Sequence, residues 1–452
     1  MYSTFRKSIP KSKIGSLKFC LTLGTHVKRS YARYGYLLSL SLLGLCLFEG
    51  CNSDDHSTNL AVQVPTLESG FNVRGSFLGV WGEDKPHGQV WFVGGELQED
   101  GSTHSLIANY SPESVTMNPT SIDGKIKLLS ESEGGLLWWI WGDEESGTLW
   151  AGGENGQILR GSTDLDSTEW VGEDILIRDD LKEKLIIWGI WGRETDRKLE
   201  IWAVGGSVRR GGPKGILLKR NPEGVWERII HSALPIEDET DPLQGRNLYK
   251  VWGNDQQIWL VGEGNITLTS HLIKDEQGQN WSTWQVIEPQ NQQAELLFTV
   301  AGSKETQANP WVVGGYAQGK VFQWQPDTFE NILSSETESS PTHLSGSWLE
   351  LSLPSLPPLN GISLSDELVL AVGAQGSLVA WSPNLDLNKF SDQDIHRQWV
   401  KDAEQMTLHS VWFSSQGKAW IVGGDLTSLK SGVIISPQSW NPQQNKISME
   451  QW

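Results

Sequence analysis

A short phrase that recurs seven times along the chain constrains its fold more than any other feature. An aliphatic-Trp-Gly step is followed about ten residues later by an apolar segment that ends in Trp-x-Val-Gly. The first copy reads Val80-Trp81-Gly82 and then Trp91-Phe92-Val93-Gly94-Gly95. Self-similarity of this kind predicts an array of equivalent units, because each unit buries its apolar surface only against its neighbours.

The first glycine of the second segment gives the period of the repeat. The spacing of this glycine varies between 50 and 59 residues, with a mean of about 55. The positions are Gly94, Gly153, Gly205, Gly262, Gly314, Gly373 and Gly423. Seven such units need about 385 residues, so the repeat leaves almost no room for a second domain.

Each unit is predicted to form four short antiparallel strands. In Val90-Trp91-Phe92-Val93 both alternating faces are apolar, so this strand needs cover on both sides. We expect the glycine pair that follows to supply the positive φ of a hairpin. A third strand comes next, and a Trp begins the fourth. These are Trp170, Trp226, Trp284, Trp348, Trp399 and Trp440.

A four-stranded sheet that is apolar on both faces cannot shield itself from water, whereas seven sheets stacked radially can. The predicted fold is therefore all-β, a seven-bladed β-propeller of four-stranded antiparallel blades. We interpret the 24 Trp as packing between blades, since an exposed stacking platform would need them at loop tips. Two closures of the ring are open: a strand near Phe71-Asn72-Val73 pairs with the last blade, or Ile447–Trp452 docks beside it.

The repeat resembles several known propeller groups. The pattern VWG…WxVGxxGxI…W is similar to the repeats of photosystem II assembly-factor-like proteins, of sialidase-type (Asp-box) propellers and of Trp-rich repeat lipoproteins. An Asp box itself is present only as a stretched version from Ser162-Thr163-Asp164 to Trp170. Kelch-like propellers are the second resemblance, through the segment from Trp311 to Trp324. The resemblance implies a propeller and leaves its function open.

The first 50 residues have the organisation of a signal peptide. They carry eight basic residues and one acid, followed by an apolar run over 37–48 that is too short to span a membrane. The run ends at Gly50-Cys51, and the junction resembles that of a bacterial lipoprotein with Cys51 as the acyl acceptor, although Glu49 departs from the usual pattern. An ordinary secretory signal with an incidental cysteine is the alternative.

Three segments are therefore predicted: a lipoprotein-type signal peptide over 1–50, a polar tether over 51–66 and the propeller over 67–452. Asn52 after the cysteine favours the outer membrane or cell envelope, with the ring facing the periplasm or the exterior. Without the first 50 residues, 28 basic and 54 acidic residues remain, a net charge of −26. Such a surface repels nucleic acid, so no nucleic-acid partner is expected.

No pattern for catalysis or for cofactor binding emerges from the repeats. The nine His form no pair or cluster with metal-ligand spacing, and we interpret them as isolated loop residues. Gly314 to Val321 resembles a P-loop but lacks the Ser or Thr that would hold magnesium. No Arg recurs at equivalent blade positions, as a sialidase site would need. We therefore predict no enzyme, no metal and no cofactor.

Three loops are candidates for recognition. Arg209, Arg210 and Lys214 lie among glycines and could capture an anionic group, or simply form an elongated hairpin. The acidic run 237–241 lacks the spacing of a calcium loop. The stretch 325–360 is rich in Ser, Pro and Glu and is predicted as a long loop, a common place for recognition.

The leading functional prediction is a monomeric, membrane-anchored binding scaffold that holds a protein or glycan partner on one face of the ring. A glycan-active hydrolase or lyase with a site in the central channel is the second hypothesis. A factor that helps to assemble a membrane complex is the third.

Overall fold

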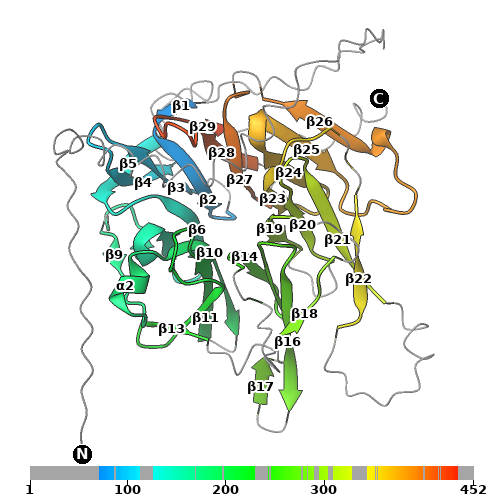
Figure 1. Cartoon of the computed structure of the whole chain (residues 1–452), viewed down its shortest axis with the longest axis horizontal. Coiled ribbons are helices and arrows are strands. Elements are labelled where there is room, and N and C mark those ends of the chain that lie inside the picture. Colours follow the sequence, from blue (N-terminus) through cyan, green and yellow to red (C-terminus); the bar gives the residue numbers. More distant parts are fainter. Residues whose placement is uncertain are drawn as a thin grey trace, which may run out of the picture.

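The computed structural model describes the repeat region of the chain. It covers residues 71–435 except 86–87, 112–125, 168, 196–197, 230–242, 244–245, 276–277, 282–283, 290–294, 304–308, 328–343, 352, 354, 401–402, 416 and 418. The described residues form seven antiparallel sheets arranged in a ring, with very little helix. The prediction of a seven-bladed β-propeller is confirmed (Figure 1).

Each sheet is one blade, and in blades 1 to 6 the strands follow one another along the chain from the axis to the rim. Blade 1 consists of β2 (Ser76–Gly82), β3 (Val90–Leu97), β4 (Thr103–Tyr110) and β5 (Ile126–Glu133). Blade 2 consists of β6 (Leu137–Asp143), β7 (Thr148–Gly153), β8 (Ile158–Ser162) and β9 (Val171–Gly172). Blade 3 consists of β10 (Ile186–Thr195), β11 (Lys198–Gly206), β12 (Ile216–Arg220) and β13 (Trp226–Arg228).

Blade 4 divides its outer place between two strands, since both β17 and β18 pair with β16. Blade 4 consists of β14 (Leu248–Gly253), β15 (Gln257–Gly262), β16 (Thr267–Asp275), β17 (Gly278–Trp281) and β18 (Gln285–Val286). Blade 5 consists of β19 (Leu297–Ala301), β20 (Trp311–Gly314), β21 (Lys320–Pro326) and β22 (Gly346–Glu350). Blade 6 consists of β23 (Leu359–Leu364), β24 (Val369–Gly373), β25 (Ser377–Trp381) and β26 (Ile395–Trp399).

Blade 7 closes the ring with a strand from the other end of the chain. Its inner strands are β27 (Thr407–Phe413), β28 (Ala419–Gly424) and β29 (Ser431–Ile435), and its outer strand is β1 (Phe71–Arg74). The first of the two expected closures is therefore present, while Ile447–Trp452 and Trp440 lie outside the described residues. The short helices are α2 (Asp179–Lys182), η2 (Glu154–Gly156), η4 (Ala374–Gly376) and η5 (Asp392–Asp394).

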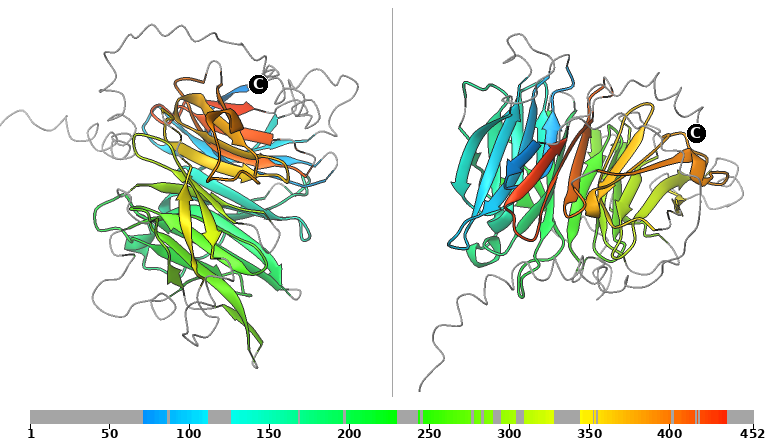
Figure 2. Two further views of the ribbon diagram at one scale, coloured as in Figure 1. Left: turned by 90° about the vertical axis from the view of Figure 1, so that its right-hand side faces the viewer. Right: turned by 90° about the horizontal axis from the view of Figure 1, so that it is seen from above.

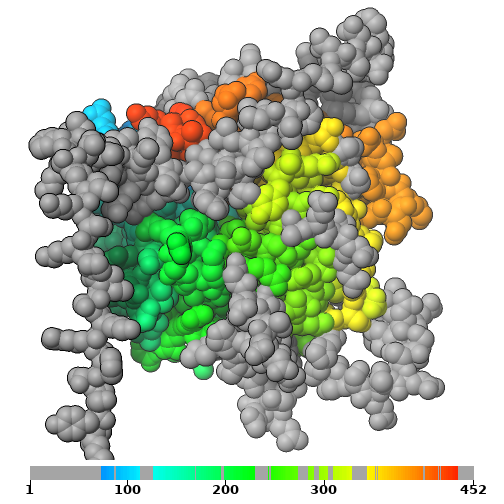
Figure 3. All heavy atoms as spheres, viewed as in Figure 1, coloured from blue at the N-terminus to red at the C-terminus, as the bar shows by residue number. Residues whose placement is uncertain are grey.

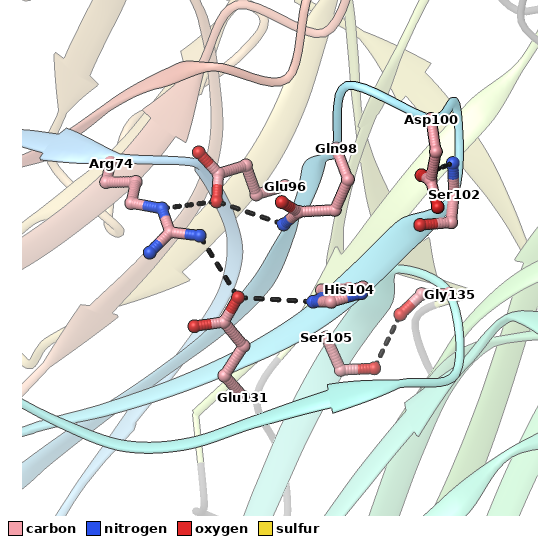
Figure 4. A network of polar contacts seen from close by, with 9 residues as sticks. All are labelled: Arg74, Glu96, Gln98, Asp100, Ser102, His104, Ser105, Glu131 and Gly135. Carbon is pink, nitrogen blue, oxygen red and sulfur yellow. Dashed lines mark hydrogen bonds and ion pairs between the residues drawn. The ribbon is translucent and has the colours of Figure 1, made fainter.

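A polar network ties β1 to blade 1 at this seam (Figure 4). The Arg74 guanidinium pairs with Glu96 at the end of β3, and its Nη2 donates to Glu131 Oε1 on β5 at 3.0 Å. His104 on β4 lies 3.2 Å from the same Glu131 oxygen. The outer strand of blade 7 and three strands of blade 1 are thus joined by side chains as well as by the backbone.

The innermost strands encircle the axis, and the blades stack face to face around it (Figures 1 and 2). The space-filling view shows the colours running around the molecule from teal through green and yellow to orange (Figure 3). Second strands are buried on both faces, as the pattern in Val90–Val93 predicts, whereas β5 and β9 at the rim are largely exposed. Six Trp side chains are fully buried in the clusters between blades, as the packing interpretation expects, namely Trp91, Trp150, Trp226, Trp259, Trp311 and Trp381. Trp399 is an exception, at 46% exposed, and it ends β26 rather than beginning it.

The expected positive φ of the glycine pair is present at Gly315 in blade 5, but the expectation was wrong for the first glycine of the pair. Gly94, Gly205 and Gly423 lie inside extended strands and do not have positive φ. They are glycine because a Cβ there would run into the backbone of the first strand of the same blade, at the carbonyl groups of Ser76, Ile186 and Thr407. The repeat therefore records a close approach of two strands rather than a turn.

The Trp-Gly step interlocks consecutive blades. The Trp of one blade lies over the glycine of the next, where an added Cβ would meet the indole ring; at Gly142 this contact with Trp81 would be 2.8 Å. The same relationship joins Trp141 to Gly192, Trp191 to Gly253, Trp252 to Gly302 and Trp412 to Gly82. Within five blades the Trp also faces a second Trp across the strand pair, as Trp81 faces Trp91 with ring centres 5.6 Å apart.

This interlock explains in which blades the Trp and the Gly of the repeat are replaced by other residues. Strand register places Ala301 of blade 5 and Ser363 of blade 6 at the Trp position. The blades that follow them carry Leu364 and Phe413 at the glycine position. Glycine is thus kept only where the preceding blade provides a Trp, and a larger side chain fills the space where it does not.

Candidate functional site

Each of the seven innermost strands contains a one-residue bulge at the same place. The register shifts by one residue opposite the boundary between the Val and the Gly of the second strand, as it does between Phe77 and Gly79. Bulges redirect side chains and are common beside functional sites. The residues at the bulge are Leu78, Trp138, Trp188, Tyr249, Phe298, Asn360 and His409.

These bulge residues meet at the axis of the ring. Trp138 of blade 2 contacts His409 of blade 7 although blade 1 lies between them, with ring centres 5.6 Å apart. Tyr249 contacts Trp188 at 5.1 Å on one side and Phe298 at 5.6 Å on the other. The centre of the propeller is therefore lined by aromatic rings from several blades.

Solvent reaches this aromatic lining unevenly. Leu78, Trp138 and Trp188 are buried, and Leu97, Leu136, Ile186, Val208, Leu426 and Leu429 pack around them. The bulge residues of blades 4 to 7 are only half-buried, namely Tyr249, Phe298, Asn360 and His409. The axis is thus closed on the side of blades 1 to 3 and open to water beside blades 4 to 7.

A lysine is buried next to the bulge of blade 4. Lys250 is 4% exposed, and its Nζ donates to the Trp188 carbonyl at 3.0 Å and lies 3.2 Å from the centre of the Trp139 ring. Trp139 Nε1 in turn donates to the Ile190 carbonyl at 3.0 Å. Burial lowers the pKa of Lys250 well below its usual value, because the charged form loses its hydration.

His409 occupies the opposite part of the axis. Its Nδ1 lies 2.7 Å from the Leu78 carbonyl, so the imidazole carries its proton on this nitrogen and donates to blade 1. Burial, with a smaller effect from the charge of Lys250, lowers the pKa of His409 to about 4. This residue lies in strand β27, which corrects the interpretation of all the His as isolated loop residues.

Beside blades 4 and 5, acidic and phenolic groups surround the opening of the axis. Glu263 Oε2 accepts hydrogen bonds from the backbone N–H of Asn247 at 3.1 Å and from its side-chain amide at 3.0 Å. Glu295 Oε2 accepts one from the backbone N–H of Tyr316 at 2.9 Å. Burial, and then the negative charge of Glu263, raises the pKa of both Tyr249 and Tyr316. We name Tyr249, Glu263, Glu295 and Tyr316 the axial mouth.

The predicted basic loop lies against this part of the ring. It connects β11 to β12, and Val208 within it packs against the buried cluster that contains Leu78, Trp138 and Trp188. Arg209 Nη1 donates to the Glu183 carbonyl at 2.6 Å, Lys214 Nζ lies 3.8 Å from Glu263 Oε2, and Arg210 is exposed. Arg209 and Lys214 thus contact different partners, and whether the three residues bind an anion stays a prediction.

The remaining candidates fall in several places. Cys51 and the acidic run 237–241 lie outside the described residues. The predicted long loop 325–360 contains the strand β22 and the start of β23, so it is shorter than expected. Gly314 to Val321 is the hairpin between β20 and β21, and Lys320 there pairs with Glu350 at 2.6 Å.

Sequence reasoning missed the bulge residues, including Tyr249 of the axial mouth, and it missed Lys250. The repeat alignment centred on Trp and Gly, whereas the axial residues stand just before the aliphatic-Trp-Gly step. That position reads Leu, Trp, Trp, Tyr, Phe, Asn and His around the ring. An excess of aromatic residues at one aligned position was the available indication.

Within the described ranges, no group of three or more His, Cys, Asp or Glu is placed to hold a metal ion. Nor does that part of the chain contain a helix long and apolar enough to cross a membrane. Comparison of the sequence with protein-family models and with curated proteins finds no match. The resemblance of the repeat to particular propeller families therefore stays a prediction.

Proposed function

We propose that this protein is a membrane-anchored binding scaffold that presents one end of a rigid propeller to a protein or glycan partner. The observation that supports it most is the content of the axis. The seven bulge residues include four aromatic rings and no carboxylate. A glycoside hydrolase needs two carboxyl groups on either side of the scissile bond, and the bulge positions supply none. The two carboxylates of the axial mouth, Glu263 and Glu295, each accept a hydrogen bond from the backbone, which favours a positioned binding group.

The side chains of the axial mouth also favour binding over catalysis in the channel. Half-buried rings beside exposed polar groups are typical of recognition sites, where the rings give contact area and the polar groups give specificity. The axial mouth combines such rings with two carboxylates that the backbone holds in place. A partner would therefore engage the end of the ring at which β10, β14 and β19 begin.

Site-specific photo-crosslinking in cells tests this proposal. A crosslinker at position 210 lies near the axial mouth, whereas one at position 367 lies in the hairpin between β23 and β24, at the opposite end of the ring. We expect a defined crosslinked species from position 210 and none from position 367. Equal yields at both positions would contradict a dedicated binding face. Turnover of a polysaccharide by the purified protein would replace the scaffold with an enzyme.

The anchor is part of the same proposal and rests on the junction at Gly50-Cys51. We expect intact-mass analysis of the membrane fraction to find a mature protein that begins at Cys51 and carries acyl chains. The Cys51→Ala variant should lose this mass and leave the membrane fraction. An unchanged location of this variant would remove the lipid anchor from the proposal.

A further inference from the structure

We infer that the axial mouth binds a lysine or arginine side chain of a partner polypeptide; this inference rests on the proposed scaffold function and names the chemistry of its site. It depends on the placement of two carboxylates beside aromatic rings. Carboxylates attract ammonium and guanidinium groups, and aromatic faces add a further attraction for the same cations.

The two carboxylates are held in place yet keep acceptor capacity. Glu263 and Glu295 each use Oε2 for hydrogen bonds from the backbone, and Glu263 is anchored further by the Asn247 side chain. Among the described residues, neither Oε1 atom has a hydrogen-bond donor. The Glu263 side chain is 33% exposed, and Glu295 and Tyr316 are also half-buried. A cation from solution can therefore reach both carboxylates.

The balance of charge around the mouth favours a cation as well. Arg246 lies nearby but pairs with Glu288 at 2.7 Å. Lys214 is the remaining cation beside Glu263, and its distance of 3.8 Å is at the limit of an ion pair. Glu263 thus has one loosely placed ammonium group beside it, and Glu295 has no cation paired with it among the described residues. A cation with better geometry would displace Lys214 and gain the second carboxylate.

The rings set the size of the group that fits. Tyr249 and Phe298 stack with their ring centres 5.6 Å apart, and both are half-buried at the open side of the axis. An aliphatic stem can lie along such rings while its charged end contacts the carboxylates, as lysine and arginine side chains commonly do. The strongly acidic surface would also raise the rate of encounter with a basic partner.

The test measures binding of two short peptides to the full-length protein by calorimetry. One is acetyl-Gly-Lys-Gly amide, and the other carries norleucine in place of lysine, which has a similar stem without the charge. We expect the lysine peptide to bind about tenfold more tightly than the norleucine peptide. Glu263→Gln and Glu295→Gln should each weaken binding of the lysine peptide by about tenfold and leave binding of the norleucine peptide unchanged.

Two controls separate a site from general attraction to an acidic protein. Glu367→Gln removes the same charge at the opposite end of the ring and should change affinity less than about twofold. Lys214→Gln removes the ammonium group that competes for Glu263 and should tighten binding of the lysine peptide by about threefold. Equal losses in Glu263→Gln and Glu367→Gln, or equal binding of the two peptides, would overturn the inference.

The outcomes for this site and for the scaffold differ. A crosslinked partner that forms equally well with wild type and with Glu263→Gln would refute the cation site and keep the scaffold. Binding of the lysine peptide without any crosslinked partner would keep the cation site and refute the scaffold.

Discussion

The amine of Lys250 lies 3.2 Å from the centre of the Trp139 ring, although the two residues belong to blades 4 and 2. They meet across blade 3, where Gly189 has no side chain; a Cβ there would come within 3.1 Å of the Lys250 Cα. The inner strands of blades 2, 3 and 4 are thus joined near the axis by Trp139, Gly189 and Lys250.

Lys250 is expected to reduce the stability of the fold at neutral pH. Because burial lowers its pKa, folding requires either loss of a proton or burial of a charge. Lys250→Met keeps the aliphatic stem and should stabilise the protein by about 1 kcal/mol in urea unfolding at pH 7. Lys430→Met, at an exposed position, should have no measurable effect. A loss of stability in Lys250→Met would mean that its bond to the Trp188 carbonyl outweighs the cost of burial.

His409 should make the ring sensitive to acid. Its pKa is lowered from 6.5 to about 4 in the folded protein, so the unfolded chain binds the extra proton first. The stability that the neutral imidazole provides is complete above pH 6.5 and falls as the pH is lowered toward 4, by at most roughly 3 kcal/mol. His409→Gln keeps a donor for the Leu78 carbonyl and should lose less stability over this window. Parallel pH profiles for the two proteins would contradict this assignment.

The interlock of Trp and Gly can be tested at a single pair. An added methyl group at Gly142 would meet Trp81 at 2.8 Å and Leu149 at 2.6 Å, so Gly142→Ala should cost about 1–3 kcal/mol. Gly172 lies on the exposed strand β9 with nothing within 4 Å of such a group. Gly172→Ala should therefore be nearly neutral in the same thermal unfolding experiment. Similar costs at both positions would indicate a general effect of replacing glycine.

Blades 5 and 6 allow the interlock to be rebuilt. Ala301 and Leu364 stand at the Trp and Gly positions and pack against the same core cluster. Ala301→Trp alone should be overpacked, and Leu364→Gly alone should leave a cavity, each costing about 1–3 kcal/mol. The double variant should recover about 1 kcal/mol or more relative to the sum of the two. Strict additivity in this double-mutant cycle would show that the two positions do not interact.

The sequence predicted the ring because its constraints are local. Val90 to Val93 is apolar on both faces, and this pattern requires a doubly covered strand wherever it occurs. The role of Gly94 could not be predicted in the same way, since glycine serves positive φ and close approach equally well. Only the position of the Ser76 carbonyl opposite it decides between the two.

The axial residues were hidden for a different reason. A bulge interrupts the alternation of side chains, so the letters around Trp138 or Tyr249 do not reveal which way these residues face. Lys250 stands where blades 1 and 3 carry Gly79 and Gly189, and it reaches Trp188 on the preceding blade rather than any sequence neighbour. Such a contact depends on the ring being closed.

Because β1 pairs with β29, the fold can be completed only after the last strand of the ring has been synthesised. During synthesis the segment Phe71–Arg74 emerges before any blade, and its partner Ser431–Ile435 emerges after the other six blades are encoded. Until then β1 has no partner strand and can pair with other chains, and the growing arc has an uncovered apolar blade face at each end. Only a chain synthesised past residue 435 can close the ring, so truncated products would expose β1 and apolar blade faces and be recognised by proteases and chaperones.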